Sequence, residues 1–237
     1  MVPESCNLPG GMTAFSPGNL LTDPDKGDPA IRSLDPLSSS SHDPPVAPSP
    51  RKSRLTERYV IVTGLPASGK STLGHAVAAA LGLPMLDKDE ILEALFDSLG
   101  VGDAEWRKRL SRAADEVLRR QALHSHGAVI ASWWRHPASH EESGTPSEWL
   151  RSLPGALLEL HCACKPEVAA ERFLARKRHE GHLDRFKSHT EILAGFRQLA
   201  TLGPLGVGRV VEVNTEQRPE LAALLSEITG PPLRREL

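Results

Sequence analysis

A glycine-rich segment, Gly64-Leu-Pro-Ala-Ser-Gly-Lys-Ser71, matches the pattern G-x4-G-K-[ST] in full. Its glycines allow the backbone to curl, so that several N–H groups point at phosphate oxygens. In this pattern Lys70 reaches the β- and γ-phosphates, the Ser71 hydroxyl ligates Mg²⁺, and Thr72 can donate to the α-phosphate. The segment therefore predicts a site for a nucleoside triphosphate with magnesium, formed by Gly64, Pro66, Ala67, Ser68, Gly69, Lys70, Ser71 and Thr72.

The residues on either side of this phosphate loop have the pattern that such a loop requires. Residues 59–63 form a short β-branched run, which predicts a buried strand, and residues 71–81 are expected to form a helix that ends at Gly82. The start of that helix adds the positive end of its dipole to the loop. The alternative is a chance match on an unrelated loop, which would need strand, loop and helix to coincide.

Two carboxylates, Asp87 and Asp89, follow a second short strand expected at residues 84–86. Ligands of a parallel sheet gather at the carboxyl ends of its strands, so either carboxylate could accept a proton from a hydroxyl that attacks the γ-phosphate. The alternative is that Asp87 or Asp89 only caps the helix expected over residues 89–99. Position alone leaves both interpretations open.

Arg172 and Arg176 lie four residues apart in a helix that is expected to begin at Pro166 and to reach about residue 178. Helical spacing of four places both side chains on one face. Such a pair could close over the triphosphate and stabilise charge during transfer. The alternative is an exposed basic helix supported by ion pairs with Glu167 and Glu171.

Strands and helices alternate along the remaining chain. Further strands are expected at residues 128–132, 156–164 and 209–213, and further helices at residues 103–126, 190–200 and 219–228. This alternation predicts a parallel sheet with helices on both faces. On the helix 103–126 we expect one stripe of Trp106, Leu110, Ala113, Val117 and Gln121, and a solvated basic stripe of Lys108, Arg112 and Arg119.

The first 55 residues differ in composition from residues 56–237. Half of the chain's 20 prolines fall within residues 1–50, and no apolar periodicity is visible there. Such a segment cannot bury enough apolar area to offset its ordering entropy, so we interpret it as a disordered Pro/Ser-rich extension. An interaction arm and a mis-assigned translation start are the alternatives.

The composition excludes several classes of protein. A net charge of −2 gives no reason to expect a nucleic acid or an anionic membrane as partner, and no apolar run approaches the roughly 18 to 20 residues of a membrane span. Residues 1–11 show no basic patch followed by an apolar stretch, so a secretory signal is not expected. Three cysteines are too few for a disulfide framework, and the cytoplasm is therefore the expected location. Cys162 and Cys164 are interpreted as buried thiols of a core strand rather than zinc ligands with His161.

Several motifs together resemble those of the small stand-alone P-loop kinases. They cover residues 58–228 and are Gly64 to Thr72, Leu86-Asp-Lys-Asp-Glu-Ile91, Leu95-Phe-Asp97, His161-Cys-Ala-Cys-Lys-Pro-Glu167, Glu171-Arg-Phe173 and Arg178-His-Glu-Gly-His-Leu-Asp184. The likeness is greatest to AAA-family ATP-binding proteins of unknown substrate, which are similar to chloramphenicol phosphotransferases, zeta toxins, gluconate kinases and the kinase half of polynucleotide kinase.

The resemblance implies a three-layer α/β fold with a five-stranded parallel sheet in the order 2-3-1-4-5 and a helical lid around Arg172 and Arg176. It implies that Asp89 matches the carboxylate that acts as base in several of these relatives. Asp87 is the alternative, and it could position Mg²⁺ through water. ATP rather than GTP is also implied only by the family. One departure is Ser132, at a strand end where many P-loop enzymes carry an aspartate for the metal.

The loop at residues 133–148 is long enough to be functional. Arg135 could bind substrate, and Trp133 and Trp134 could either form a pocket wall or pack under the loop.

Three functions fit these patterns. The first is an ATP- and Mg²⁺-dependent kinase that phosphorylates a hydroxyl of a small molecule, with Lys70, Asp89, Arg172 and Arg176 as catalytic residues. The second is a nucleotide-binding module or slow ATPase without an acceptor, which the missing aspartate at Ser132 favours. The third is a polynucleotide 5′-kinase, which the net charge of −2 does little to support. Oligomeric state has no signature in the sequence.

Overall fold

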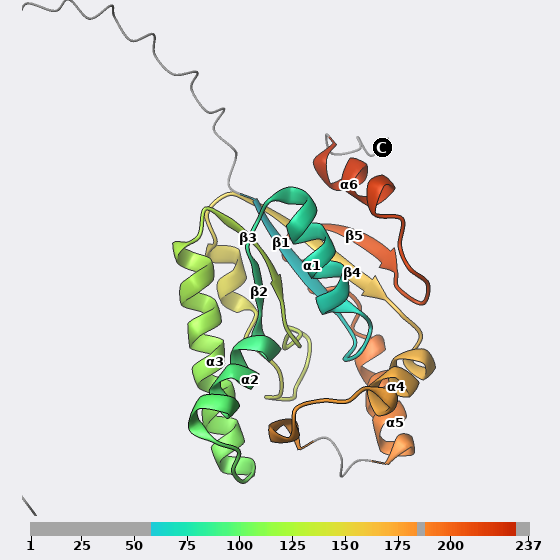
Figure 1. The fold of residues 1–237 in the computed structure, drawn as a ribbon. Coiled ribbons are helices and arrows are strands. Elements are labelled where there is room, and N and C mark those ends of the chain that lie inside the picture. Colours follow the sequence, from blue (N-terminus) through green and yellow to red (C-terminus); the bar gives the residue numbers. More distant parts are fainter. Residues whose placement is uncertain (1–57, 184–187, 231–237) are drawn as a thin grey trace, which may run out of the picture. The chain divides into compact units, whose positions relative to one another are not determined.

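A computed structural model describes residues 58–183 and 188–230. They contain a five-stranded parallel sheet with the spatial order β2-β3-β1-β4-β5, as the family resemblance implied (Figure 1). The strands are β1 (Arg58–Gly64), β2 (Met85–Asp87), β3 (Gly127–Ala131), β4 (Ala156–Ala163) and β5 (Arg209–Asn214). The predicted extension at residues 1–55 lies outside the described residues.

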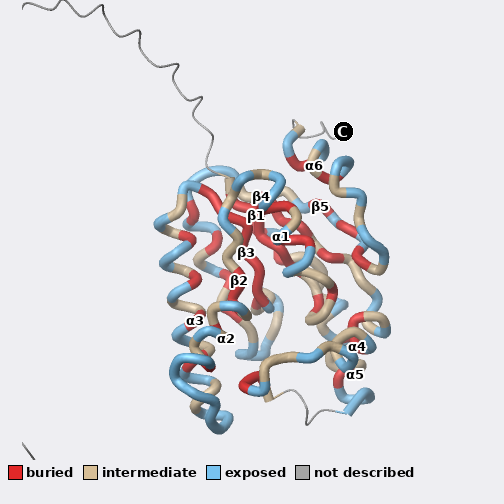
Figure 2. Tube along the Cα trace, viewed as in Figure 1, coloured by how far each residue is buried: buried red, intermediate tan, exposed pale blue. Residues whose placement is uncertain are grey.

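The central strand β1 explains how the sheet is covered on both faces. Its residues Tyr59 to Val62 are fully buried (Figure 2). Their side chains alternate between two apolar clusters, one on each face of the sheet. Val60 and Val62 pack with helices α1 (Lys70–Leu81) and α6 (Leu221–Thr229). Tyr59 and Ile61 pack on the other face with α3 (Ala104–His124) and with residues of the 3₁₀ helix η1 (Glu148–Ser152). Helices therefore cover both faces, as the strand–helix alternation predicted.

The remaining helices surround the end of the sheet at which the strands terminate (Figure 1). Helix α2 (Lys88–Leu99) packs against α3 through Leu92, Phe96 and Leu110. Helices α4 (Pro166–Ala175) and α5 (His189–Ala200) pack on each other, with the rings of Phe173 and Phe196 edge to face at 5.6 Å. A short 3₁₀ helix, η2 (Glu180–His182), follows α4.

Two details of the helices differ from the sequence prediction. The stripe predicted through Ala113 and Val117 of α3 is wrong, since both are exposed; the helix buries Leu110, Ala114, Leu118 and Ala122, which keep a strict spacing of four. Helix α4 ends at Ala175 rather than near residue 178, so Arg176 already has an extended backbone. Within the two described ranges, no helix has both the length and the apolar character needed to cross a bilayer.

Candidate functional site

The phosphate loop connects β1 to α1, and its backbone has the shape that its glycines allow. Gly64 has φ 127° and Gly69 has φ 97°, values that side chains rarely tolerate. A Cβ on Gly64 would also lie 2.7 Å from the carbonyl oxygen of Cys162 on β4, so this position has room for glycine alone. Pro66, Ala67, Gly69, Lys70, Ser71 and Thr72 line a large cleft, whereas Ser68 is fully buried.

Lys70 lies across the mouth of this loop. Its Nζ donates to the carbonyl oxygens of Gly64, at 3.1 Å, and of Leu65, at 2.7 Å. Burial is the main cause that lowers the pKa of Lys70, and the Arg176 charge acts in the same direction, while Cys162, Asp89 and Asp87 act in the opposite one. The ammonium group is thus surrounded by the charged groups that the sequence analysis assigned to the site.

Asp87, the last residue of β2, fits both of the interpretations that the sequence left open: a helix cap and a residue of the site. It is the N-cap of α2, because its carboxylate accepts from the Asp89 N–H at 2.8 Å, and it is also a buried group of the cleft. Burial raises the pKa of Asp87, while the hydroxyl of Ser71 and the Asp89 N–H act in the opposite direction. The hydroxyl and the carboxylate that were predicted to serve the metal therefore lie side by side.

Asp89 lies in the first turn of α2 and forms an ion pair with Arg178, whose Nη2 is 2.6 Å from its Oδ2. Burial by itself would raise the pKa of Asp89, but the charges of Arg178, His182, Lys70 and Arg176 outweigh it, and the pKa is lowered. Asp89 is therefore an ionised carboxylate at neutral pH. Arg178 belongs to the motif at residues 178–184, but no feature of that motif marks it as the partner of Asp89.

The structure separates the two arginines that were predicted to act as a pair. Arg172 donates from Nη1 to the carbonyl oxygen of Thr215 and from Nη2 to that of Glu216, both at 2.8 Å, and so holds the turn that follows β5. Arg176 lies beyond the end of α4, with its guanidinium 4.7 Å from the ring centre of Phe173, and its charge acts on Lys70 and Asp89. Both line the cleft, but only Arg176 acts electrostatically on these two groups.

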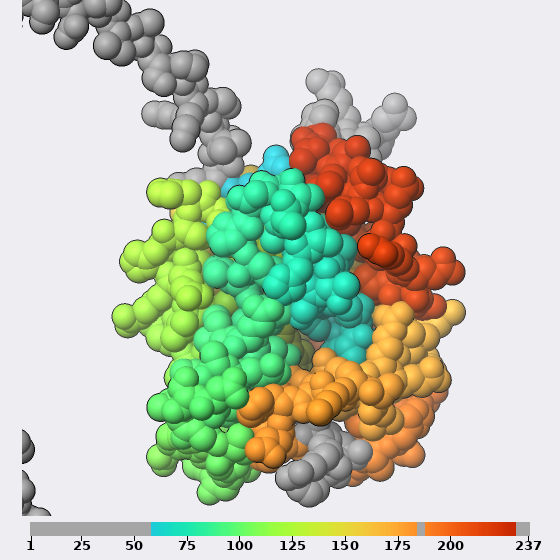
Figure 3. Space-filling model, in the orientation of Figure 1, coloured from blue at the N-terminus to red at the C-terminus, as the bar shows by residue number. Residues whose placement is uncertain are grey.

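The segment after α4 lies against α2, as Figure 3 shows for the orange and green parts of the surface. His182 is 2.8 Å from a carboxylate oxygen of Glu93, and His179 is 3.3 Å from one of Asp97. Phe96 stacks on the ring of His179 at 5.3 Å and meets the ring of His182 edge to face. Arg178 directly precedes His179 in the chain, so these contacts hold Arg178 beside Asp89.

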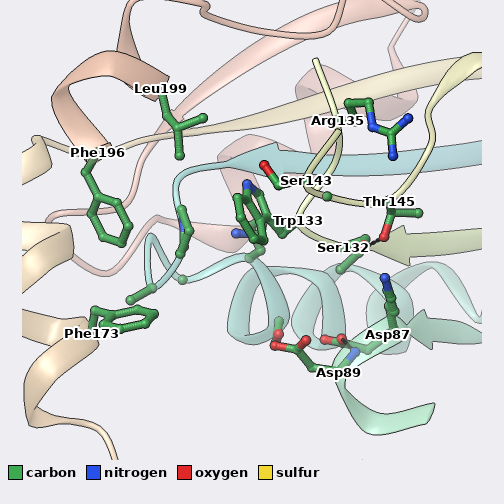
Figure 4. A pocket seen from close by; sticks show the side chains of 18 of the residues that line it. Asp87, Asp89, Ser132, Trp133, Arg135, Ser143, Thr145, Phe173, Phe196 and Leu199 are labelled. Carbon is green, nitrogen blue, oxygen red and sulfur yellow. Dashed lines mark hydrogen bonds between the residues drawn. The ribbon is translucent and has the colours of Figure 1, made fainter. Parts of the chain in front are cut away.

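The loop after β3 is closed by hydrogen bonds that involve Ser132 and Thr145. Their hydroxyl oxygens are 2.6 Å apart, and the backbone N–H of Arg135 donates to the carbonyl oxygen of Thr145 at 2.7 Å (Figure 4). Ser132 is thus used to close the loop. The two tryptophans have different positions: Trp134 is buried and its Nε1 donates to the carbonyl oxygen of Val62, whereas Trp133 is 40% exposed and lines the cleft.

The cleft has a volume of about 1610 Å³ and is bounded by the phosphate loop, the loop after β3, the first half of α3 and the segment after α4. It contains every residue assigned to the site by the sequence except Gly64 and Ser68, and also residues that were not predicted. Among these additional residues are Lys88, Arg107, Ser111, Asp115, Arg178 and His182. Helical spacing of four along α3 could have indicated Arg107, Ser111 and Asp115, but nothing local could have indicated that this stripe faces a cavity.

Cys162 and Cys164, the two cysteines among the described residues, do not line the cleft. Cys162 is buried on β4, as predicted, and burial raises its pKa to about 11, which makes it an inert thiol. Cys164 lies beyond the end of β4 and is partly exposed, so its prediction as a buried strand residue is wrong. In the described part of the chain, no three His, Cys, Asp or Glu side chains form a metal-binding group.

A family model described as an AAA domain matches residues 60–201, which is more than half of the chain. The chain belongs to the AAA domain family. Among solved structures, this AAA domain is similar to a proposed kinase from Chloroflexus aurantiacus, at 28% identity and a TM-score of 0.60, over 73% of this chain and 97% of that one. The resemblance to small P-loop kinases is thereby confirmed.

Two curated relatives extend the comparison. A shikimate kinase of Bordetella avium is 30% identical over 138 residues, which are 54% of this chain and 56% of that protein. An uncharacterized protein of Mycobacterium tuberculosis is 27% identical over 132 residues, 51% of this chain and 26% of that protein. The AAA domain thus spans about a quarter of one relative and just over half of the other.

Proposed function

We propose that this P-loop kinase-like protein transfers the γ-phosphoryl group of ATP to a hydroxyl of a small molecule, with Mg²⁺. The observation that carries the proposal is that Asp89, ionised by its pairing with Arg178, lines the same cleft as Lys70 and the phosphate loop. Asp87 already supplies a carboxylate for Mg²⁺, so a second carboxylate in the cleft suits a phosphoryl acceptor better than a module that only holds nucleotide. A cleft of about 1610 Å³ is large enough for a nucleotide and a second ligand.

The oxygen donors beside the phosphate loop suit magnesium. The Ser71 hydroxyl would ligate the ion directly, and the neighbouring carboxylate of Asp87 would hold it through water. When bound, Mg²⁺ neutralises charge on the β- and γ-phosphates. Lys70 would exchange the two loop carbonyls that it now binds for phosphate oxygens.

In the proposed reaction the acceptor hydroxyl oxygen forms a bond to the γ-phosphorus, and the bond to the β–γ bridging oxygen breaks, so that ADP leaves. The carboxylate of Asp89 orients the hydroxyl and takes its proton. Because its pKa is lowered, Asp89 is a weak base, and the proton moves to it only as the new bond forms. Arg176 stabilises charge on the transferred group, while Arg172 holds the turn at Thr215 and Glu216.

A nucleotide-binding module or slow ATPase is the second candidate. The observation that favours it is at the end of β3, where Ser132 is engaged with Thr145 and supplies no carboxylate for the metal. Such a module would hydrolyse ATP at a rate that no added acceptor increases. The third candidate, a 5′-kinase of polynucleotides, would phosphorylate an oligonucleotide that ends in a 5′-hydroxyl.

Asp89→Asn tests the proposal. ADP release would be measured against pools of metabolites, and ATP affinity by calorimetry. We expect the variant to lose acceptor-dependent ADP release by about 10²-fold or more and to keep its ATP affinity. Glu90→Gln, an exposed neighbour on the same helix that does not line the cleft, is the matched control. Turnover of Asp89→Asn equal to that of the control would remove Asp89 from the mechanism, and acceptor-independent release would favour the module.

A further inference from the structure

One stripe of α3 faces the cleft. Arg107, Ser111 and Asp115 are spaced by four residues, so they lie one above another on the helix, and all three line the cleft. The neighbouring stripe begins at Leu110 and is buried, first against α2 and then, from Leu118 on, against the sheet. Because the buried stripe fixes how α3 is rotated about its axis, the packing of the helix determines which of its residues face the cleft.

An ion pair fixes this stripe relative to the phosphoryl-transfer residues. Asp115 binds Lys88 at 2.6 Å, and Lys88 lies between Asp87 and Asp89 in the chain. Arg107 is eight residues before Asp115, or about 12 Å further along the helix axis. Since α3 leads into β3 of a parallel sheet, that direction points to the carboxyl edge of the sheet and away from the core.

The loop after β3 supplies a second arginine. The backbone of Arg135 is held at both its N–H and its carbonyl oxygen, which bind Thr145 and the Ser147 hydroxyl, each at 2.7 Å. Its guanidinium Nη2 donates to the backbone carbonyl of Glu142 at 2.6 Å. In Figure 4, Arg135 lies on the side of the cleft opposite to Asp87 and Asp89.

These two arginines carry charge that no described side chain neutralises. Within residues 58–183 and 188–230, Arg107 and Arg135 form no ion pair, whereas Lys88 is paired with Asp115 and Arg178 with Asp89. The Nε atoms of both Arg107 and Arg135 are also buried without a hydrogen-bond partner. A buried donor without a partner is unfavourable, so these groups fit a ligand that supplies negatively charged oxygens.

We infer that the phosphoryl acceptor of this protein carries an anionic group, a carboxylate or a phosphate, that is bound by Arg107 and Arg135. This inference rests on the proposed kinase function. The reacting hydroxyl lies at Asp89, the anionic group lies toward Arg107 and Arg135, and the exposed ring of Trp133 forms a flat apolar wall of the same cleft. The segment after α4 is docked on α2 through Glu93 and Asp97 and bounds one side of the cleft, an arrangement that suits a small molecule.

The test is calorimetry of the full-length protein with Mg²⁺ and a non-hydrolysable ATP analogue. The ligands are hydroxylated metabolites in matched sets, each with a neutral, a carboxylate and a phosphate member, such as glycerol, glycerate and glycerol 3-phosphate. We expect binding only by anionic members, and the set identifies carboxylate or phosphate as the group. An oligonucleotide with a 5′-hydroxyl is included; if it alone bound, the acceptor would be a nucleic acid and the inference would be wrong.

The variant Arg107→Gln should raise the Kd of the anionic ligand about tenfold or more and leave the Kd of the ATP analogue unchanged. Arg107→Lys should restore part of the affinity, which a purely structural role would not predict. Arg109→Gln is the matched control, since Arg109 is on the same helix, does not line the cleft and is exposed beside Glu105. Arg135→Gln should act as Arg107→Gln does, although its bond to the carbonyl of Glu142 can also order the loop.

The outcomes separate this inference from the proposed function. Binding by neutral members, no binding by any anionic member, or equal affinities for Arg107→Gln and Arg109→Gln would each overturn the anion site. When ATP replaces the analogue, ADP release with the bound anion supports both statements. An anion that binds through Arg107 without ADP release would contradict the kinase and leave the anion site in place.

Discussion

Glu159 on β4 is a fully buried carboxylate whose partners are all hydrogen-bond donors. Its Oε1 accepts from the Thr63 hydroxyl at 2.8 Å and from the Leu205 N–H at 2.7 Å. Its Oε2 accepts from the N–H groups of Gly206 and Val207, at 2.8 and 3.2 Å. Because Thr63 directly precedes the phosphate loop, this one side chain connects the end of β1 to the segment that leads into β5.

The variant Glu159→Gln replaces one of these oxygens by an NH₂ group, which cannot accept. Two buried donors then lose their partner and face another donor. Each such loss is worth about 1–3 kcal/mol, so we expect the free energy of unfolding to fall by about 2–6 kcal/mol. For a domain of this size that corresponds to a decrease in Tm of roughly 4 to 24 °C.

Thermal and urea unfolding of the purified protein measure this difference. The control is Glu212→Gln on the neighbouring strand β5, where the side chain is exposed and the change should be within about 0.5 kcal/mol. The affinity for ATP should fall as well, since Thr63 is the residue before Gly64. If Glu159→Gln unfolded at the same urea concentration as Glu212→Gln, the argument that this carboxylate orders the two segments would be wrong.

Three further predictions concern the site. Arg178→Gln removes the charge that lowers the pKa of Asp89, so that pKa should rise and the acid limb of the kcat/KM profile should move to higher pH; an unmoved limb would mean that Asp89 does not titrate in the reaction. Arg172→Ala should mainly raise the KM for ATP, because it releases the Thr215 turn, whereas Arg176→Ala should lower kcat by about 10²-fold. If both variants had the same effect, the different roles given to Arg172 and Arg176 would be wrong. Gly64→Ala should weaken ATP binding more than tenfold in calorimetry, because its Cβ has no room beside Cys162; Gly195→Ala, with open space inside α5, should instead raise Tm by a few degrees.

The parts of the fold that the sequence predicted well are those specified by neighbouring residues. The β-branched run at residues 59–63 and the glycine pattern after it place a buried strand and a phosphate loop without reference to any distant contact. Asp103 caps α3 through the Trp106 N–H, and Gly82 ends α1 in the left-handed conformation, as expected. The strand order, by contrast, came from the family resemblance, since composition and periodicity do not determine it.

The parts that were missed depend on residues far apart in the chain. Arg178 and Asp89 are separated by 89 positions, and Glu159 and Leu205 by 46, so neither contact has a local signature. Trp133 and Trp134 are neighbours of the same type, and only the carbonyl of Val62, 72 residues away from Trp134, distinguishes the buried ring from the exposed one. The expected end of α4 was wrong for a related reason. The five residues after Ala175 include no glycine or proline, and the helix ends where the chain turns toward α2.

The contacts of the segment after α4 explain why the site depends on α2. Asp89, Glu93 and Asp97 are spaced by four residues and form a row of carboxylates along that helix, and they bind Arg178, His182 and His179 respectively. Burial and the charge of Arg178 lower the pKa of His182, while Glu93 and Asp89 act in the opposite direction. The pair at Asp89, next to the phosphate loop, is the one that an arginine forms, and it does not depend on a histidine proton. The contact between Arg178 and Asp89 therefore has two effects: it holds the segment on α2, and it lowers the pKa of the proposed base.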